Sequence, residues 1–305
     1  MNTQIVESRI SSTKTFWLLI SIALLSLLLR DFPALNFFFA PFNQFSVLLH
    51  EASHALACIF TGGQVSALTI VEDGNGHGGL TFTQGGIPFI YSQAGYMGEA
   101  LWGCLFIAVS RYPRLSRWIL FLIGLGIGLI SLLFMGSGLF QAGMFFPALA
   151  SMLWGFAIAA GFVWVAGKLS NRWANMLLMF VAVQLCLGSL QGVWVLFLQS
   201  LGFFPGTWSD ATNMQRLTGI PAAVWGICWS VFSLGMFSFT FWATFKADHS
   251  TAKQEKESKL KLSAYTEAQS AKRISADANI EQELMELHQN VDMGQKIKIK
   301  KEERR

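Results

Sequence analysis

The sequence contains few charged residues. Asp, Glu, Lys and Arg together account for 13% of the 305 residues, whereas hydrophobic residues account for 53%. Soluble domains carry about a quarter charged residues, so this composition excludes an ordinary water-exposed surface. The long apolar runs indicate instead that the chain belongs to the class of membrane proteins.

Acidic residues are scarcest in the middle of the chain. The C-terminal stretch 246–305 alone contains 11 of the 18 acidic residues and 13 of the 22 basic ones. Between Asp31 and Lys246, the acidic residues are Glu51, Glu72, Asp73, Glu99 and Asp210. An ionisable side chain at membrane depth is costly and is usually retained for function, so each of these is a candidate functional residue.

The sequence also lacks closely paired cysteines. Its four cysteines lie in apolar segments and show no C-x-x-C spacing, which predicts buried free thiols that pack as small hydrophobic side chains. The net charge of +4 resides in the C-terminal tail and the short loops. We interpret this charge as a signal of membrane orientation and expect no binding of nucleic acid.

The apolar runs predict six or seven transmembrane helices. The first run, 16–29, is short and is either a span or an uncleaved signal anchor, and the second covers about 35–60. Each of the later runs is near the length needed to cross a bilayer. They cover about 88–109, 118–135, 144–167, 174–199 and 219–245.

Residues 61–87 interrupt the helical pattern and predict a small β-hairpin. The stretch 64–71 is rich in β-branched and polar residues, a Gly-rich turn follows, and 80–83 predicts the return strand. Inside a membrane such a hairpin must be buried in protein or line a wet cavity. Its strands could offer an edge to an unwound substrate segment, or form a lid or plug. The predicted fold class is therefore all-α and polytopic, with one inserted hairpin.

Basic residues mark one side of the membrane. Arg111, Arg114 and Arg117 lie in one loop, and Lys168 and Arg172 lie in the next loop but one. By the positive-inside rule, these loops and the C-terminal tail are expected in the cytoplasm. A bacterial inner membrane is the default expectation for the location.

We divide the chain into three regions. An N-terminal segment covers 1–34, a membrane-embedded core covers 35–246, and a charged tail covers 247–305. The tail is expected to be solvated and partly disordered because it is polar and has almost no aromatic residues. Apolar residues at helical spacing predict a short amphipathic helix at 275–290.

The second apolar run contains the motif H-E-x-x-H. His50 and His54 are four residues apart, so both imidazoles lie on one helix face, where each can offer a nitrogen to one zinc ion. Glu51 stands beside them as a candidate general base for water. Ionisable residues packed this densely in an apolar helix need a compensating partner, and a metal ion supplies one.

Two histidines do not complete a catalytic zinc site, which needs three protein ligands and an open position. The candidates for the third ligand are Glu72, Asp73, His77, Glu99 and Asp210. Glu99 is alternatively a buried polar anchor that faces the zinc helix, or a structural hydrogen-bond acceptor. Asp210 is alternatively a helix N-cap. Reasoning from the residue pattern alone leaves the choice open.

The motif and its surroundings resemble the site-2 protease family of zinc metallopeptidases, in its compact branch without a PDZ domain. The resemblance covers about residues 45–230. It rests on LHEASHALA at 49–57, TGG at 61–63, HGGLT at 77–81, AGYMG at 94–98, SDA at 209–211 and TGIP at 218–221. Glu99 stands where the family pattern leads us to expect a small residue. The resemblance implies that Asp210 is the third zinc ligand.

The predicted function is that of an intramembrane zinc endopeptidase. The resemblance implies that it hydrolyses peptide bonds in or near transmembrane segments of other membrane proteins, with Zn²⁺ held by His50, His54 and Asp210. Two alternatives are a zinc-binding membrane scaffold that does not cleave and a transporter that uses the intramembrane charges. Transport would be favoured by an internal repeat, and no convincing repeat is present.

Overall fold

The structure is a computed structural model that describes residues 33–71, 78–110, 112–200 and 209–302, with isolated positions between 17 and 28. Most of the first predicted helix, and Glu72, Asp73 and His77 of the hairpin turn, lie outside the described residues. The chain forms two compact units, Met1–Phe245 and Lys246–Arg305.

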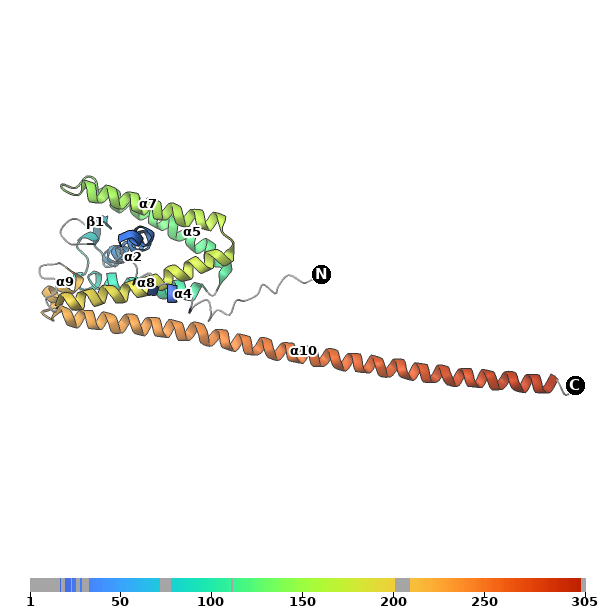
Figure 1. Cartoon of the computed structure of the whole chain (residues 1–305). Helices are drawn as coiled ribbons and strands as arrows, with labels where there is room; N and C mark the ends of the chain where they lie inside the picture. The colour runs from blue at the N-terminus through green and yellow to red at the C-terminus, as the bar shows by residue number, and fades with distance from the viewer. Residues whose placement is uncertain are drawn as a thin grey trace. The chain divides into compact units, whose positions relative to one another are not determined.

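The first unit is built mainly from helices (Figure 1). In chain order they are α2 (Pro33–Phe60), α3 (Pro88–Tyr91), α4 (Ala94–Val109), α5 (Pro113–Ile130), α6 (Gly136–Gly138), α7 (Phe145–Lys168), α8 (Asn171–Ser200), α9 (Asp210–Thr218) and α10 (Ala222–Glu302). A π-helical turn, η1 (Ser131–Met135), joins α5 to α6.

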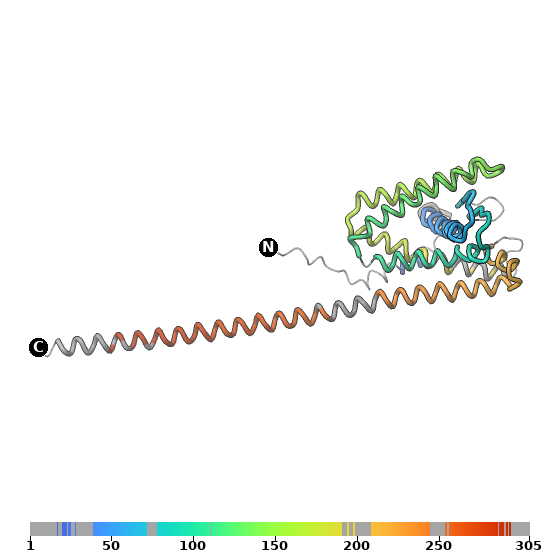
Figure 2. The backbone as a smooth tube through the Cα atoms, turned by 180° about the vertical axis from the view of Figure 1, so that it is seen from behind, coloured from blue at the N-terminus to red at the C-terminus, as the bar shows by residue number. Residues whose placement is uncertain are grey.

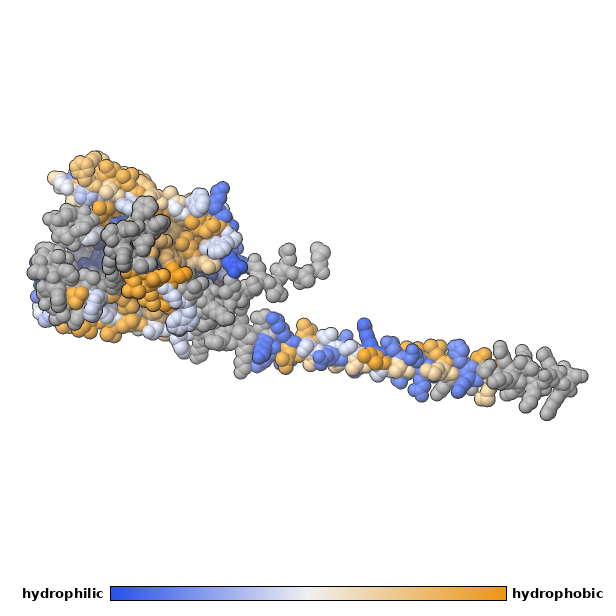
Figure 3. All heavy atoms as spheres, viewed as in Figure 1, coloured by the Kyte–Doolittle hydropathy of each residue, from blue (hydrophilic) through white to orange (hydrophobic). Residues whose placement is uncertain are grey.

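Among the described residues, four stretches are long and apolar enough to cross a membrane: Pro113–Gly138, Phe145–Lys168, Asn171–Leu190 and Ala222–Thr244. The helix Ala94–Val109 is apolar but shorter. Hydrophobic residues also cover much of the visible face of the first unit (Figure 3). These features confirm the predicted class, a helical membrane protein.

The predicted hairpin is confirmed. Strand β1 (Gln64–Thr69) pairs antiparallel with β2 (Leu80–Gln84), and the register is irregular between Val65 and Ala67. The hairpin is anchored in the protein, because Ile70 N–H donates to Ser151 Oγ at 2.9 Å. The backbone N–H just after β1 is thereby satisfied within the protein, as the hydrocarbon region requires.

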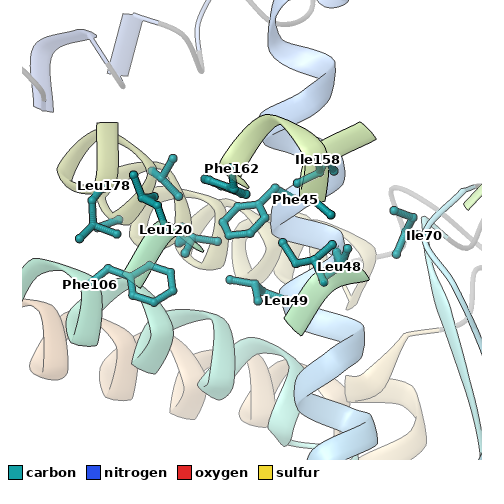
Figure 4. Packing of buried hydrophobic residues seen from close by; sticks show 14 of the residues in the cluster. Phe45, Leu48, Leu49, Ile70, Phe106, Leu120, Ile158, Phe162 and Leu178 are labelled. Atoms are coloured by element: carbon teal, nitrogen blue, oxygen red, sulfur yellow. The ribbon is translucent and has the colours of Figure 1, made fainter. Parts of the chain in front are cut away.

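Helix α2 lies in the middle of the first unit, with other helices on both sides (Figure 2). Its residues Phe45, Leu48 and Leu49 belong to the main hydrophobic core. Phe45 meets Phe162 of α7 edge to face, with ring centroids 5.1 Å apart, and Leu178 of α8 belongs to the same cluster (Figure 4). This packing places the next two turns of α2, which carry the H-E-x-x-H motif, inside the protein.

The thiols follow the prediction with one exception. Cys58, Cys104 and Cys186 are buried and free, whereas Cys228 is exposed. Cys228 is exposed because it lies on a face of α10 that no other described element covers, beside the exposed Ile227.

The tail is more helical than the sequence predicts. Instead of a partly disordered chain with a short helix at 275–290, the structure describes helix from Lys246 to Glu302 as part of α10. The physical reason is composition, because the tail is rich in Ala, Glu, Lys and Gln and has no proline and no glycine before Gly294.

Candidate metal centre

The two motif histidines lie side by side on α2. Their ring centroids are 4.8 Å apart, as expected for residues one helical turn apart. The side chain of His50 is 16% exposed and that of His54 is 9% exposed. Between them in sequence, Glu51 is also buried. The motif therefore presents two imidazoles and a carboxylate within the interior of the first unit.

Asp210 lies 160 residues after His50 in the sequence and contacts both histidines. Its Oδ2 atom lies 3.0 Å from His50 Nε2 and 3.2 Å from His54 Nε2. Burial alone would raise the pKa of the Asp210 carboxyl, but the adjacent His54 and His50 hold that pKa well below its ordinary value. Asp210 is thus an anion that faces two imidazole nitrogens.

The N-cap of α9 is Ser209, so Asp210 is free of that role. The Thr212 N–H donates to Ser209 Oγ at 3.3 Å, and the Ser209 N–H donates to Thr212 Oγ1 at 3.0 Å. This reciprocal pair is a capping box. The alternative that Asp210 caps the helix is wrong, because the neighbouring serine does so.

The donor set of His50, His54 and Asp210 fits a metal ion. One ligand atom from each lies within 4.8 Å of the others. Two ligands bound about 2.1 Å from one tetrahedral zinc ion lie about 3.4 Å apart, and the two Asp210–histidine distances are within a few tenths of an ångström of that value. Gly95 of α4 leaves the required space, because a Cβ atom there would collide with Nε2 of both histidines.

A backbone carbonyl orients His54. His54 Nδ1 lies 2.6 Å from the carbonyl oxygen of Tyr91, the last residue of α3. A carbonyl oxygen only accepts, so Nδ1 carries a hydrogen, and in the neutral imidazole Nε2 is then the nitrogen left to bind a metal ion. This contact gives no sequence signal, because any residue at position 91 supplies the same carbonyl.

Strand β2 orients Glu51. The hydroxyl of Thr81 donates to Glu51 Oε2 at 2.7 Å. Gly79, just before the strand, lies against the same carboxylate, and a Cβ atom there would collide with Glu51 Oε1 and Cγ. The sequence suggested that this hairpin offers an edge to a substrate segment or forms a lid or plug. It did not single out Thr81, because no spacing rule links Thr81 to Glu51.

Glu99 lies on the opposite side of His50 from Asp210. Its Oε2 atom is 3.9 Å from His50 Nδ1, and its Oε1 atom accepts a hydrogen bond from Ser46. It faces the ring nitrogen that does not face Asp210, and it does not join the three-residue cluster. Glu99 is thus the buried polar anchor that the sequence offered as an alternative.

An aromatic stack connects His50 to α9 and α10. Tyr96 meets the His50 ring edge to face with centroids 4.5 Å apart, and stacks on Trp229 of α10 at 5.4 Å. Trp229 belongs to a small buried cluster with Ala211 and Met214 of α9. This cluster fixes the short helix that carries Asp210.

Comparison with known proteins identifies one matching family model. The sequence model of the Peptidase M50B-like family matches residues 17–240, a range that contains the motif helix, the hairpin and Asp210. Searches of the curated proteins and of the solved structures found no match. Since the family model covers most of the chain, this protein belongs to the Peptidase M50B-like family, the membrane metallopeptidases of the site-2 protease kind that the sequence motifs resemble.

Proposed function

We propose that the protein is a zinc-dependent intramembrane endopeptidase that hydrolyses peptide bonds in or near transmembrane segments of other membrane proteins. The observation that carries the proposal is that His50 Nε2 and His54 Nε2 both lie close to Asp210 Oδ2. The two histidines share their helix with the buried Glu51. Family membership and the four apolar spans support the same function.

His50, His54 and Asp210 are the residues proposed to hold the ion. Two neutral imidazoles and one carboxylate form a donor set that zinc accepts in catalytic sites, where three protein ligands leave one position open. Zinc bound there would supply a Lewis acid that polarises the peptide carbonyl and lowers the pKa of water.

Glu51 is proposed to act as the general base and acid. Thr81 occupies its Oε2 atom, and Gly79 packs against the same carboxylate without a side chain that would collide with Oε1. Oε1 is thus the atom proposed to take a proton from the water that attacks the carbonyl carbon. The same atom returns the proton to the amine nitrogen as the peptide bond breaks.

The hairpin is proposed to receive the substrate backbone. Residues 67–70 at the end of β1 are buried, whereas Leu80, Phe82 and Thr83 of β2 are partly exposed. Because β2 also contacts Glu51 through Thr81, a segment that pairs with the edge of β2 that no described strand covers would lie near the general base. Such pairing requires the substrate to be locally unwound, since the backbone donors and acceptors of a helix are already paired within the helix.

The tail is proposed to lie in the cytoplasm. Arg117 Nε near the start of α5 donates to the carbonyl of Ala166 near the end of α7 at 2.8 Å, which supports placing the two basic loops at one end of the first unit. Successive spans then return the end of the α10 span at Thr244 to that side. A reporter fused after Arg305 that is active only in the periplasm should remain inactive.

The test uses the purified full chain in lipid vesicles and a panel of single-span reporters with a helix-destabilising Asn-Pro pair in the span. We expect cleavage by the wild type and none by Glu51→Gln, with equal zinc content in the two proteins. Zinc binding without cleavage of any reporter would contradict the proposal and favour the non-cleaving scaffold. A wild type without bound zinc would favour the transporter.

A further inference from the structure

Glu99 is a buried acidic residue in an apolar helix. Its side chain is 5% exposed and lies within α4 among apolar neighbours. An acidic group in such a place requires a compensating partner. Among the described residues, no lysine or arginine forms a salt bridge with it, and its ion-pair partner within 4 Å is His50.

Three helices form the site around this carboxylate. Ser46 of α2 donates a hydrogen bond to Oε1 of Glu99, which α4 carries. Gly188 of α8 closes the site, since a Cβ atom there would collide with Glu99 Oε1 and with Ser46 Oγ. Ser46 fixes one oxygen of the carboxylate and thereby directs Oε2 toward His50 Nδ1, 3.9 Å away.

The two histidines of the motif therefore differ in what faces Nδ1. The backbone carbonyl of Tyr91 faces Nδ1 of His54 at hydrogen-bond distance. The Glu99 carboxylate faces Nδ1 of His50 at ion-pair distance. A role as acceptor for Ser46 accounts for Oε1 alone. It does not account for the second oxygen, Oε2, being directed at a candidate metal ligand.

We propose that Glu99 is a positioning residue for His50, an inference that rests on the proposed function. Its carboxylate attracts the Nδ1–H group of the imidazole and thereby holds the ring so that Nε2 faces the proposed metal position. Carboxylates behind metal-bound histidines fix the tautomer and increase the basicity of the ligand nitrogen. Glu99 does not touch the reacting atoms.

The test is a zinc-affinity titration of the purified full chain against a competing chelator. Loss of such a carboxylate lowers metal affinity by about 10- to 100-fold, and we expect this loss for Glu99→Gln, which preserves size and the contact with Ser46. The absorption spectrum of bound Co²⁺ should also shift, because the ligand field of His50 changes. Wild-type affinity together with an unchanged Co²⁺ spectrum in Glu99→Gln would overturn the inference.

Two controls separate positioning from general damage to packing. Ser116→Ala removes a buried hydrogen bond between α5 and α8, to Asn175 at 2.7 Å, and should leave zinc affinity unchanged. Ser46→Ala keeps Glu99 but releases Oε1, and should lower affinity about fivefold. If Glu99→Gln fails to fold, wild-type affinity in Ser46→Ala overturns the inference.

A double-mutant cycle tests whether Glu99 acts through His50. In a His54→Ala background, Glu99→Gln should still weaken zinc binding, whereas in a His50→Ala background it should have no further effect. Equal effects in the two backgrounds would overturn the inference while leaving the proposed function intact. A wild type that binds no zinc would overturn both.

Discussion

The two helices that carry the candidate metal ligands differ in how firmly the protein holds them. Helix α2, with His50 and His54, runs through the main hydrophobic core and packs against residues of α4, α5, α7 and α8. Helix α9, with Asp210, is nine residues long, and its buried residues Ala211 and Met214 belong to a small separate cluster. The α2 side of the site is therefore fixed by the fold, whereas the α9 side depends on a few contacts.

This difference suggests a division of roles within the site. The chemistry and two ligands come from the rigid helix, and the third ligand comes from a helix that a small change can displace. Short elements with few buried apolar contacts open locally at a lower free energy than core helices do. Substitutions near α2 and near α9 should therefore have different effects on catalysis and on zinc binding.

The largest effect is expected on the α2 side, from Glu51→Gln. This change removes the proton acceptor but no metal ligand, so turnover should fall by about 10²- to 10⁴-fold while zinc content stays the same. Single-turnover cleavage of a spanning reporter and metal analysis of the same sample measure both quantities. Substantial residual cleavage would mean that another group accepts the proton.

A smaller effect is expected on the α9 side, from Trp229→Ala. Trp229 is 1% exposed and packs against α9 and Tyr96, so its loss should loosen the helix that presents Asp210. Zinc affinity should fall on the order of tenfold, as measured by chelator competition. Trp154→Ala is the matched control, because Trp154 packs against the main core and its loss should lower the melting temperature without changing zinc affinity. Equal zinc affinities in the two variants would contradict the comparison.

The smallest of these effects is expected from Thr81→Val, which preserves shape but removes the hydrogen bond to Glu51. The net contribution of one hydrogen bond is about 0.5 to 1.5 kcal/mol, so kcat should fall by about two- to tenfold with zinc affinity unchanged. Thr81→Ser keeps the hydroxyl and should restore most of the activity. The idea fails if Thr81→Ser is as slow as Thr81→Val.

The sequence predicts those parts of the fold that are encoded locally. The H-E-x-x-H spacing, the apolar runs and the Gly-rich hairpin each lie within a short window, where helix and strand periodicity apply. Asp210 lies 160 residues from His50. The choice of Asp210 among the five candidates came from a resemblance, because periodicity contains no information on which distant segments meet.

The contacts that orient the site could not be predicted from the sequence. Tyr91 acts through its backbone carbonyl, which has no residue signature. Thr81 and Trp229 act across contacts between elements that only the folded chain brings together. Glu99 was visible as a rare acid in an apolar run, but its direction toward His50 Nδ1 depends on how α4 crosses α2.

The central claim is that Asp210 completes a zinc centre with the two motif histidines. The most direct measurement is the zinc content and affinity of the purified wild type, His50→Ala and Asp210→Ala. Zinc sites built from several protein ligands bind with about 10 to 16 kcal/mol, so loss of one ligand should lower affinity on the order of a hundredfold or more. We predict near-stoichiometric zinc in the wild type and similar losses in the two variants. Retention of zinc by Asp210→Ala, with loss in His50→Ala, would contradict the account.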